Sequence, residues 1–334
     1  MRKLAILLLS LAAVGAAPPD PAAPQPAAPS RPAAEAPPLP GEEGFAVDFG
    51  EDRHERMTVP VSIGARGPYR FIVDTGAERT VIARELASTL QLIASGKARL
   101  HSMTEVSDIQ TVAIPALEVG GKEVRGIQAP ALERRNLGAE GMLGVDSLQA
   151  QRVSFDFDRQ QMTVVPSRKH EESWTQDAIV VRAQNRFGHL VLVDASVEGQ
   201  KVWVIVDTGA QATVGNGALL RKLQKKGKLK SLAAVEMISV TGGRLTADQS
   251  LVKHIRLGGV DIYDLPVAFA DVHPFKQLGL TDRPAILLGM DALRLFERVS
   301  VDFANRRVRL LAPGRSERAP STQSALASVP KSGA

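Results

Sequence analysis

The sequence contains no cysteine among its 334 residues. This absence excludes disulfide frameworks, thiolate nucleophiles and zinc sites built on cysteine. The sequence also lacks the His-Glu-x-x-His pattern of zinc proteases, the Gly-x-Ser-x-Gly turn of serine hydrolases and the glycine-rich phosphate loop of nucleotide-binding proteins. Any chemistry that the chain performs must therefore use other side chains.

An excess of positive charge is also missing from the part of the chain that we expect to fold. The formal net charge is +5, but the segments at the two termini carry three of those charges. The remainder is close to neutral for its size, and nucleic-acid partners usually require a basic surface. We therefore expect no nucleic-acid partner.

Long apolar runs are confined to the first 17 residues, which have the layout of a secretory signal peptide. Arg2 and Lys3 precede the apolar run 4–17, which ends in small residues. A membrane span needs roughly 20 apolar residues, and no other segment approaches that length. We predict an exported, periplasmic protein with no integral membrane span after cleavage. An uncleaved N-terminal anchor is the alternative.

The two regions that flank the expected fold have biased compositions. Residues 18–42 are almost entirely proline and alanine up to residue 40, which favours an extended linker. Residues 313–334 are rich in serine, alanine and proline, which predicts a disordered tail. The folded part is then about 43–312.

Strand signals dominate this folded part. Short runs rich in valine, isoleucine and phenylalanine often alternate with polar residues, as in 57–63 and 299–303. Glycine pairs at Gly120-Gly121 and Gly258-Gly259 separate apolar runs and indicate hairpins. Two segments have a helical pattern, and they are 83–95 and 217–226. The sequence therefore predicts an all-β protein with few helices.

Four landmarks of the sequence occur twice in the same order. They are Asp74 and Asp207, 117–132 and 255–270, 141–148 and 286–293, and 153–157 and 299–303. The separation between the copies grows along the chain, as expected for a duplication with small insertions in the second copy. We predict a first lobe over 43–167 and a second lobe over 168–312.

The first landmark is an unusual phrase, FIVDTGAERTV at 71–81 and VIVDTGAQATV at 204–214. Each copy places an aspartate where an apolar strand ends in a tight turn. A single copy is explained as a plain turn, because aspartate and glycine both favour turns. A single buried carboxylate is costly, but two that meet can share a proton. Such a pair supplies an acid and a base at the same pH.

These phrases resemble the Asp-Thr-Gly-Ala-x-x-Thr-Val loops of retropepsin-like aspartic proteases. Met142-Leu143-Gly144 and Leu287-Leu288-Gly289 resemble the second signature of that family, which crosses behind the catalytic loop. The following Asp146 and Asp291 resemble the bacterial branch. The resemblance covers nearly all of 55–311. It implies two tandem retropepsin-like β-barrel lobes, with short helices after the catalytic loops.

The resemblance also implies an aspartic endopeptidase that acts on polypeptide substrates without metal or cofactor. Asp74 and Asp207 would form the catalytic dyad, and Thr75 and Thr208 would cross-link the two loops. By the same resemblance, the substrate backbone would be bracketed by Gly76 and Gly209. One chain carries both loops, which implies a monomer with two lobes around a pseudo-twofold axis.

Other candidate substrate contacts follow from the same resemblance. Glu78 and Gln211 lie where retroviral members have an acidic residue near the substrate, and Gln211 departs from that pattern. The second lobe is five residues longer between its aspartate and its glycine pair, and this region contains Thr241-Gly242-Gly243. We expect a flap there that covers the substrate. The corresponding segment 101–108 has no glycine.

Three alternatives remain open at this point. Asp146 and Asp291 are interpreted as caps of the short helices that follow them, in preference to a catalytic role. The protein could be a non-catalytic peptide-binding module of the cell envelope that retains the protease fold. It could also be an enzyme that works only as a dimer, with Asp74 facing another Asp74.

Overall fold

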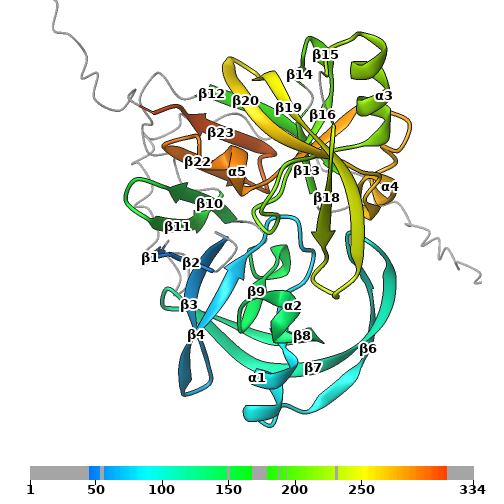
Figure 1. The fold of residues 1–334 in the computed structure, drawn as a ribbon. Coiled ribbons are helices and arrows are strands. Elements are labelled where there is room, and N and C mark those ends of the chain that lie inside the picture. The colour runs from blue at the N-terminus through cyan, green and yellow to red at the C-terminus, as the bar shows by residue number, and fades with distance from the viewer. Residues whose placement is uncertain are drawn as a thin grey trace, which may run out of the picture. The chain divides into compact units, whose positions relative to one another are not determined.

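The computed structural model describes residues 45–52, 56–148, 151–167, 179–186, 189–192, 194–229 and 232–313 (Figure 1). The predicted signal peptide and linker lie outside the described residues, as does the predicted tail after residue 313. Export to the periplasm and the lobe boundary near residue 168 therefore stay predictions. Among the helices in the described part of the chain, none is long and apolar enough to cross a membrane.

Strands form most of the first lobe. They are β1 Phe45–Asp48, β2 Gly50–Glu51, β3 Met57–Ile63, β4 Arg66–Val73, β5 Val81–Ala83, β6 Ala94–His101, β7 Val106–Val119, β8 Lys122–Leu132, β9 Gly141–Leu143, β10 Gln151–Asp156 and β11 Gln161–Pro166. Its helical elements are α1 Arg84–Thr89, α2 Arg134–Leu137 and the single 3-10 turn η1 Val145–Ser147.

The second lobe has a similar series of elements. Its strands are β12 Ile179–Arg186, β13 His189–Leu192, β14 Ala195–Val197, β15 Gln200–Lys201, β16 Trp203–Val206, β17 Val214–Gly215, β18 Ala233–Ile238, β19 Arg244–Leu257, β20 Val260–Phe269, β21 Ala285–Leu288, β22 Arg298–Asp302 and β23 Arg307–Leu311. Its helices are α3 Gly217–Lys225, α4 His273–Gln277 and α5 Met290–Leu293. The predicted all-β fold class is confirmed.

Strand pairing repeats between the lobes, which explains why the landmarks recur in one order. In the first lobe the order is β4-β9-β5-β8-β7-β6, and pairing of β3 with both β4 and β7 closes six strands into a barrel. In the second lobe the order is β16-β21-β17-β20-β19, with β18 paired to β19. The hairpins predicted at Gly120-Gly121 and Gly258-Gly259 join β7 to β8 and β19 to β20. Both hairpins are confirmed.

The second-lobe sheet continues through β13 into a part that joins the two lobes, in the order β12-β23-β22-β10-β11-β1. At its centre the two copies of the last landmark pair with each other, so that Ser154 lies opposite Ser300. Their hydroxyl oxygens are 2.9 Å apart. The flanking Val153, Phe155 and Val301 are buried, as the alternation of apolar residues in these strands requires. This register places the local twofold centre of the duplication between the two serines.

One expectation about local structure is wrong. The helix predicted over 83–95 ends at Thr89, because the segment from Ala94 instead pairs with β7. This long-range pairing overrides the local helical pattern. Most of the five extra residues of the second lobe lie before its hairpin tip. His101 and Ile238 end the first strand of each hairpin, and Val106 and Arg244 begin the second strand. When these residues are aligned, four of the five extra residues precede the end of β18 and one lies in the turn.

Candidate active site

The two Asp-Thr-Gly phrases begin where β4 and β16 end. Both strand ends are buried runs of aliphatic residues, Ile72-Val73 and Ile205-Val206. Each run pairs in parallel with the strand that carries the second signature, β9 or β21. The Asp74 amide donates to the Leu143 carbonyl at 3.0 Å, and the Asp207 amide donates to the Leu288 carbonyl at 3.1 Å. Burial between paired strands therefore fixes where each loop starts.

Two threonines bind the loops to each other across the lobe interface. The Thr208 hydroxyl accepts the Thr75 amide at 3.0 Å and donates to the Val73 carbonyl at 2.7 Å. Reciprocally, the Thr75 hydroxyl accepts the Thr208 amide at 3.2 Å and donates to the Val206 carbonyl at 3.1 Å. Both side chains are buried, so water cannot replace these bonds without cost. The loops are therefore held in one mutual arrangement.

The two aspartate carboxyl groups lie against the opposite loop. Asp74 Oδ1 accepts the amides of Gly76 and Ala77 at 2.7 and 3.0 Å, and Asp207 Oδ1 accepts the equivalent amides at 2.9 and 3.2 Å. A Cβ atom at Gly76 would lie 2.7 Å from Asp207 Cγ, and one at Gly209 would overlap the Asp74 carboxyl group. Only glycine leaves room for this close approach.

The electrostatics of the pair favour a proton on one carboxyl group. Burial raises the pKa of Asp207 well above its ordinary value, and the negative charge of Asp74 and a side-chain hydrogen bond with it raise that pKa further. The amides of Gly209 and Ala210 act in the opposite direction. Two adjacent carboxyl groups titrate as one unit, so the proton belongs to the pair. The arrangement can accept one proton and donate another at the same pH.

The raised pKa predicts how stability depends on pH. Between the unfolded pKa of about 3.9 and the raised pKa of Asp207, the folded chain binds more protons than the unfolded chain. The free energy of unfolding therefore falls as pH rises through this window. The Asp207→Asn variant has no carboxyl group to ionise at this position, so it does not lose stability in this way. Denaturant unfolding should therefore show the variant gaining stability relative to the natural chain as pH rises above the unfolded pKa. An exposed control, Asp158→Asn, should show no such gain. Parallel pH profiles for all three proteins would contradict the prediction.

The second signature crosses directly behind each loop. A Cβ atom at Gly144 would lie 2.6 Å from the Arg79 carbonyl oxygen, and one at Gly289 would lie 2.6 Å from the Ala212 carbonyl. The residues that follow these glycines bond to the loops, because Val145 donates its amide to Ala77 and Met290 donates its amide to Ala210. Close backbone packing thus supports both loops from behind.

Asp146 and Asp291 hold the last part of each loop. They do not occupy the cap position predicted for them but lie two residues further on, where each accepts the amide of the residue that follows it at 2.8 Å. Neither η1 nor α5 has a side-chain cap, and Gly144 and Gly289 occupy the cap positions. Asp146 also accepts the amide and hydroxyl of Thr80 at 2.9 and 2.8 Å. Asp291 accepts the same groups of Thr213 at 2.9 and 2.6 Å.

Thr80 and Thr213 are not among the functional residues predicted from the sequence. Their separation of 133 residues equals that of the two aspartates, and this equality was the available signal.

Both lobes carry a hairpin whose tip reaches the other lobe. Thr241-Gly242-Gly243 lies at the turn between β18 and β19, and Ser102–Glu105 forms the turn between β6 and β7. The Thr241 hydroxyl donates to the Ser102 hydroxyl at 3.3 Å. The His273 amide donates to the Met103 carbonyl at 2.9 Å, and the rings of His101 and His273 stack. This tip-to-tip contact is not predictable from either hairpin sequence taken alone.

The two remaining candidates, Glu78 and Gln211, lie on the exposed side of their loops. The Glu78 carboxylate accepts a hydrogen bond from Gln277 of α4 at 3.3 Å. The backbone carbonyls of Glu78 and Gln211 accept the amides of Asp146 and Asp291 at 3.2 and 3.1 Å. At these two positions the backbone therefore repeats between the lobes while the side chains differ.

A pair of carboxyl groups held together by two symmetric Asp-Thr-Gly loops defines the aspartic-protease class of site. A comparison with protein families gives the same class, because the aspartyl protease family model matches residues 59–147 and 193–292. These two matches together cover more than half of the chain, and the chain belongs to this family. No curated protein matched the chain.

Proposed function

We propose that the protein is an aspartic endopeptidase in which Asp74 and Asp207 together activate a water molecule. The observation that carries this proposal is the reciprocal pair of threonine cross-links, which keeps each carboxyl group against the glycine of the other loop. Because its pKa is raised, the Asp207 carboxyl group carries the proton that the reaction needs at its start.

The reaction uses the two carboxyl groups in opposite roles. Asp74 takes a proton from water as the water oxygen bonds to the scissile carbonyl carbon, and Asp207 gives its proton to the carbonyl oxygen. The resulting diol collapses when Asp74 passes its proton to the amide nitrogen and the carbon–nitrogen bond breaks. Asp207 recovers a proton from a diol hydroxyl group. The products are a carboxylic acid and an amine, and the pair returns to its starting state.

The proposed substrate is a polypeptide that lies extended in the cleft between the lobes. Main-chain hydrogen bonds and alternating side-chain pockets would hold it, as in other extended-peptide complexes. Gly76 and Gly209 would bracket its backbone, with Glu78 and Gln211 further along the same loops. The hairpin tip at Thr241-Gly242-Gly243 would cover it and exclude water.

Incubation of the purified protein with an unfolded protein substrate tests the proposal. We expect internal cleavage, seen by mass spectrometry, and complete inhibition by a pepstatin-type peptide whose hydroxyl group mimics the diol. The Asp74→Asn variant is the control for a contaminating protease. Peptide binding that persists without any cleavage by the natural chain would contradict an enzyme and support the peptide-binding module.

The covering role of the second-lobe hairpin gives a separate prediction. Deleting Gly242 and Gly243 should reduce peptide turnover while circular dichroism and thermal unfolding stay close to those of the natural chain. The turn bonds that would be lost are local, from Ser239 to Gly243 and from Gly242 to Ser239. Unchanged turnover in the deletion variant would show that this hairpin does not act as the lid.

A further inference from the structure

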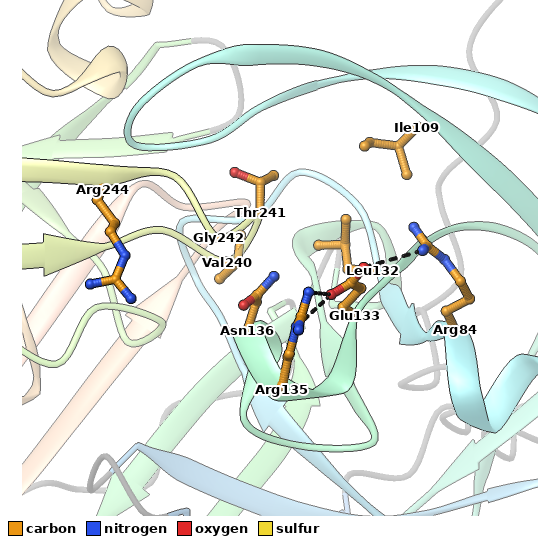
Figure 2. A pocket seen from close by; sticks show the side chains of 10 residues that line it. All are labelled: Arg84, Ile109, Leu132, Glu133, Arg135, Asn136, Val240, Thr241, Gly242 and Arg244. Atoms are coloured by element: carbon orange, nitrogen blue, oxygen red, sulfur yellow. Dashed lines mark hydrogen bonds and ion pairs between the residues drawn. The ribbon is translucent and has the colours of Figure 1, made fainter.

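A cavity of about 470 Å³ lies between the first lobe and the hairpin tip of the second lobe (Figure 2). The first lobe contributes α1, β7, the end of β8 and the start of α2, and the second lobe contributes the tip and the first residue of β19. The lining residues are Arg84, Ile109, Leu132, Glu133, Arg135, Asn136, Val240, Thr241, Gly242 and Arg244. Any occupant of this cavity would therefore contact the proposed lid.

The lining carries more positive than negative charge. It contains three arginines and one carboxylate, that of Glu133. Figure 2 shows Arg84 and Arg135 reaching Glu133 from opposite sides, at 3.5 and 2.7 Å. Arg244 pairs with Glu236, which does not line the cavity, at 2.5 Å. Two guanidinium groups thus flank one carboxylate, and the charged side chains that line this cavity carry a net positive charge. Glu85 lies in the adjoining hollow with the same two arginines.

A ligand could reach these groups from solvent. The side chains of Arg84 and Arg135 are 60% and 79% exposed, so a ligand need not displace a buried ion pair to reach them. Arginine presents paired donors that match the two oxygens of a carboxylate. Leu132, Ile109 and Val240 add an aliphatic surface to the same cavity. A short methylene chain that ends in a carboxylate would match both the arginine donors and the aliphatic surface of this cavity.

We propose that this cavity is a specificity subsite for an acidic side chain, glutamate or aspartate, of the peptide substrate. The inference rests on the proposed function, because it assigns the substrate side chain that lies beneath the lid. Arg84 and Arg135 bind the carboxylate, and the aliphatic residues contact its stem. Substrates with an acidic residue at the matching position are preferred over their neutral analogues.

A set of peptides that differ by one glutamate-to-glutamine exchange at successive positions tests the subsite. Acetylated and amidated ends leave the side chain as the only carboxylate. At one position we expect the glutamine peptide to have a KM about tenfold higher, consistent with a charge-assisted contact. In Arg84→Gln and Arg135→Gln the ratio of the two KM values, glutamine peptide to glutamate peptide, should fall to about one. In Arg125→Gln, an exposed arginine outside the cavity lining, the ratio should persist.

Three outcomes are informative. Loss of the KM ratio in Arg84→Gln and Arg135→Gln, with the ratio retained in Arg125→Gln, supports the subsite. A preference that survives in both variants, or no charge preference at any position, overturns it. If no peptide is cleaved, the proposed function fails. Fluorescence anisotropy with the same labelled peptides then decides the subsite by affinity, again expecting a glutamate preference that Arg84→Gln and Arg135→Gln abolish.

Discussion

Replacing Asp74 or Asp207 with asparagine is expected to lower kcat for peptide hydrolysis by at least about a thousandfold, the range attributed to a positioned acid or base. Each asparagine keeps the size of the side chain and removes a group that must gain or lose a proton. Because the two carboxyl groups act as one unit, the double variant should be no worse than either single variant. Steady-state kinetics with a fluorogenic peptide measure all three.

Controls separate lost chemistry from lost structure. Thermal unfolding of both single variants should show a folded chain, and Asp158→Asn, on the exposed surface, should retain full turnover. Retention of more than a tenth of the natural kcat in either single variant would contradict the proposed mechanism. Activity lost in Asp74→Asn but kept in Asp207→Asn would instead favour a dimeric site formed by two copies of Asp74.

Replacing Thr208 with valine is expected to have the second-largest effect. Valine has the shape of threonine but leaves the Thr75 amide and the Val73 carbonyl without their partner in a buried site. Each unsatisfied group costs about 1–3 kcal/mol, so the two together should lower the free energy of unfolding by roughly 2–6 kcal/mol. The carboxyl groups would also lose their fixed arrangement, so kcat should fall as well.

Thr208→Ser is the matched control, because serine keeps the hydroxyl group. Urea unfolding and peptide turnover should both lie close to those of the natural chain. If valine and serine were tolerated equally in both measurements, the threonine cross-links would not be the device that holds the two loops together.

Local patterns and the duplication predicted much of the fold. The strands that enter the Asp-Thr-Gly loops are recognisable because they are short runs of β-branched residues that end in a glycine turn. The recurrence of four landmarks in one order identified the two lobes, and the strand order repeats accordingly. These features depend on residues that are close in the sequence, or on comparison of one half with the other.

Apart from the meeting of the two Asp-Thr-Gly loops, which the family resemblance implied, features that depend on contacts between distant residues were not predictable. The end of α1 at Thr89 is set by pairing of the next segment with β7. The bonds from Asp146 to Thr80 cross 66 residues, and a cap is what the local sequence suggests. The cavity charges depend on Arg84 meeting Glu133, 49 positions away. No periodicity or spacing in a single sequence specifies such encounters.

Titration of the active site with a tight-binding pepstatin-type inhibitor tests the central claim most directly. The claim is that Asp74 and Asp207 of one chain form a single catalytic pair. The residual rate of peptide cleavage should then fall linearly to zero at one inhibitor molecule per chain, with the chain sedimenting as a monomer. An endpoint at one inhibitor per two chains, or cleavage that the inhibitor does not affect, would contradict the account.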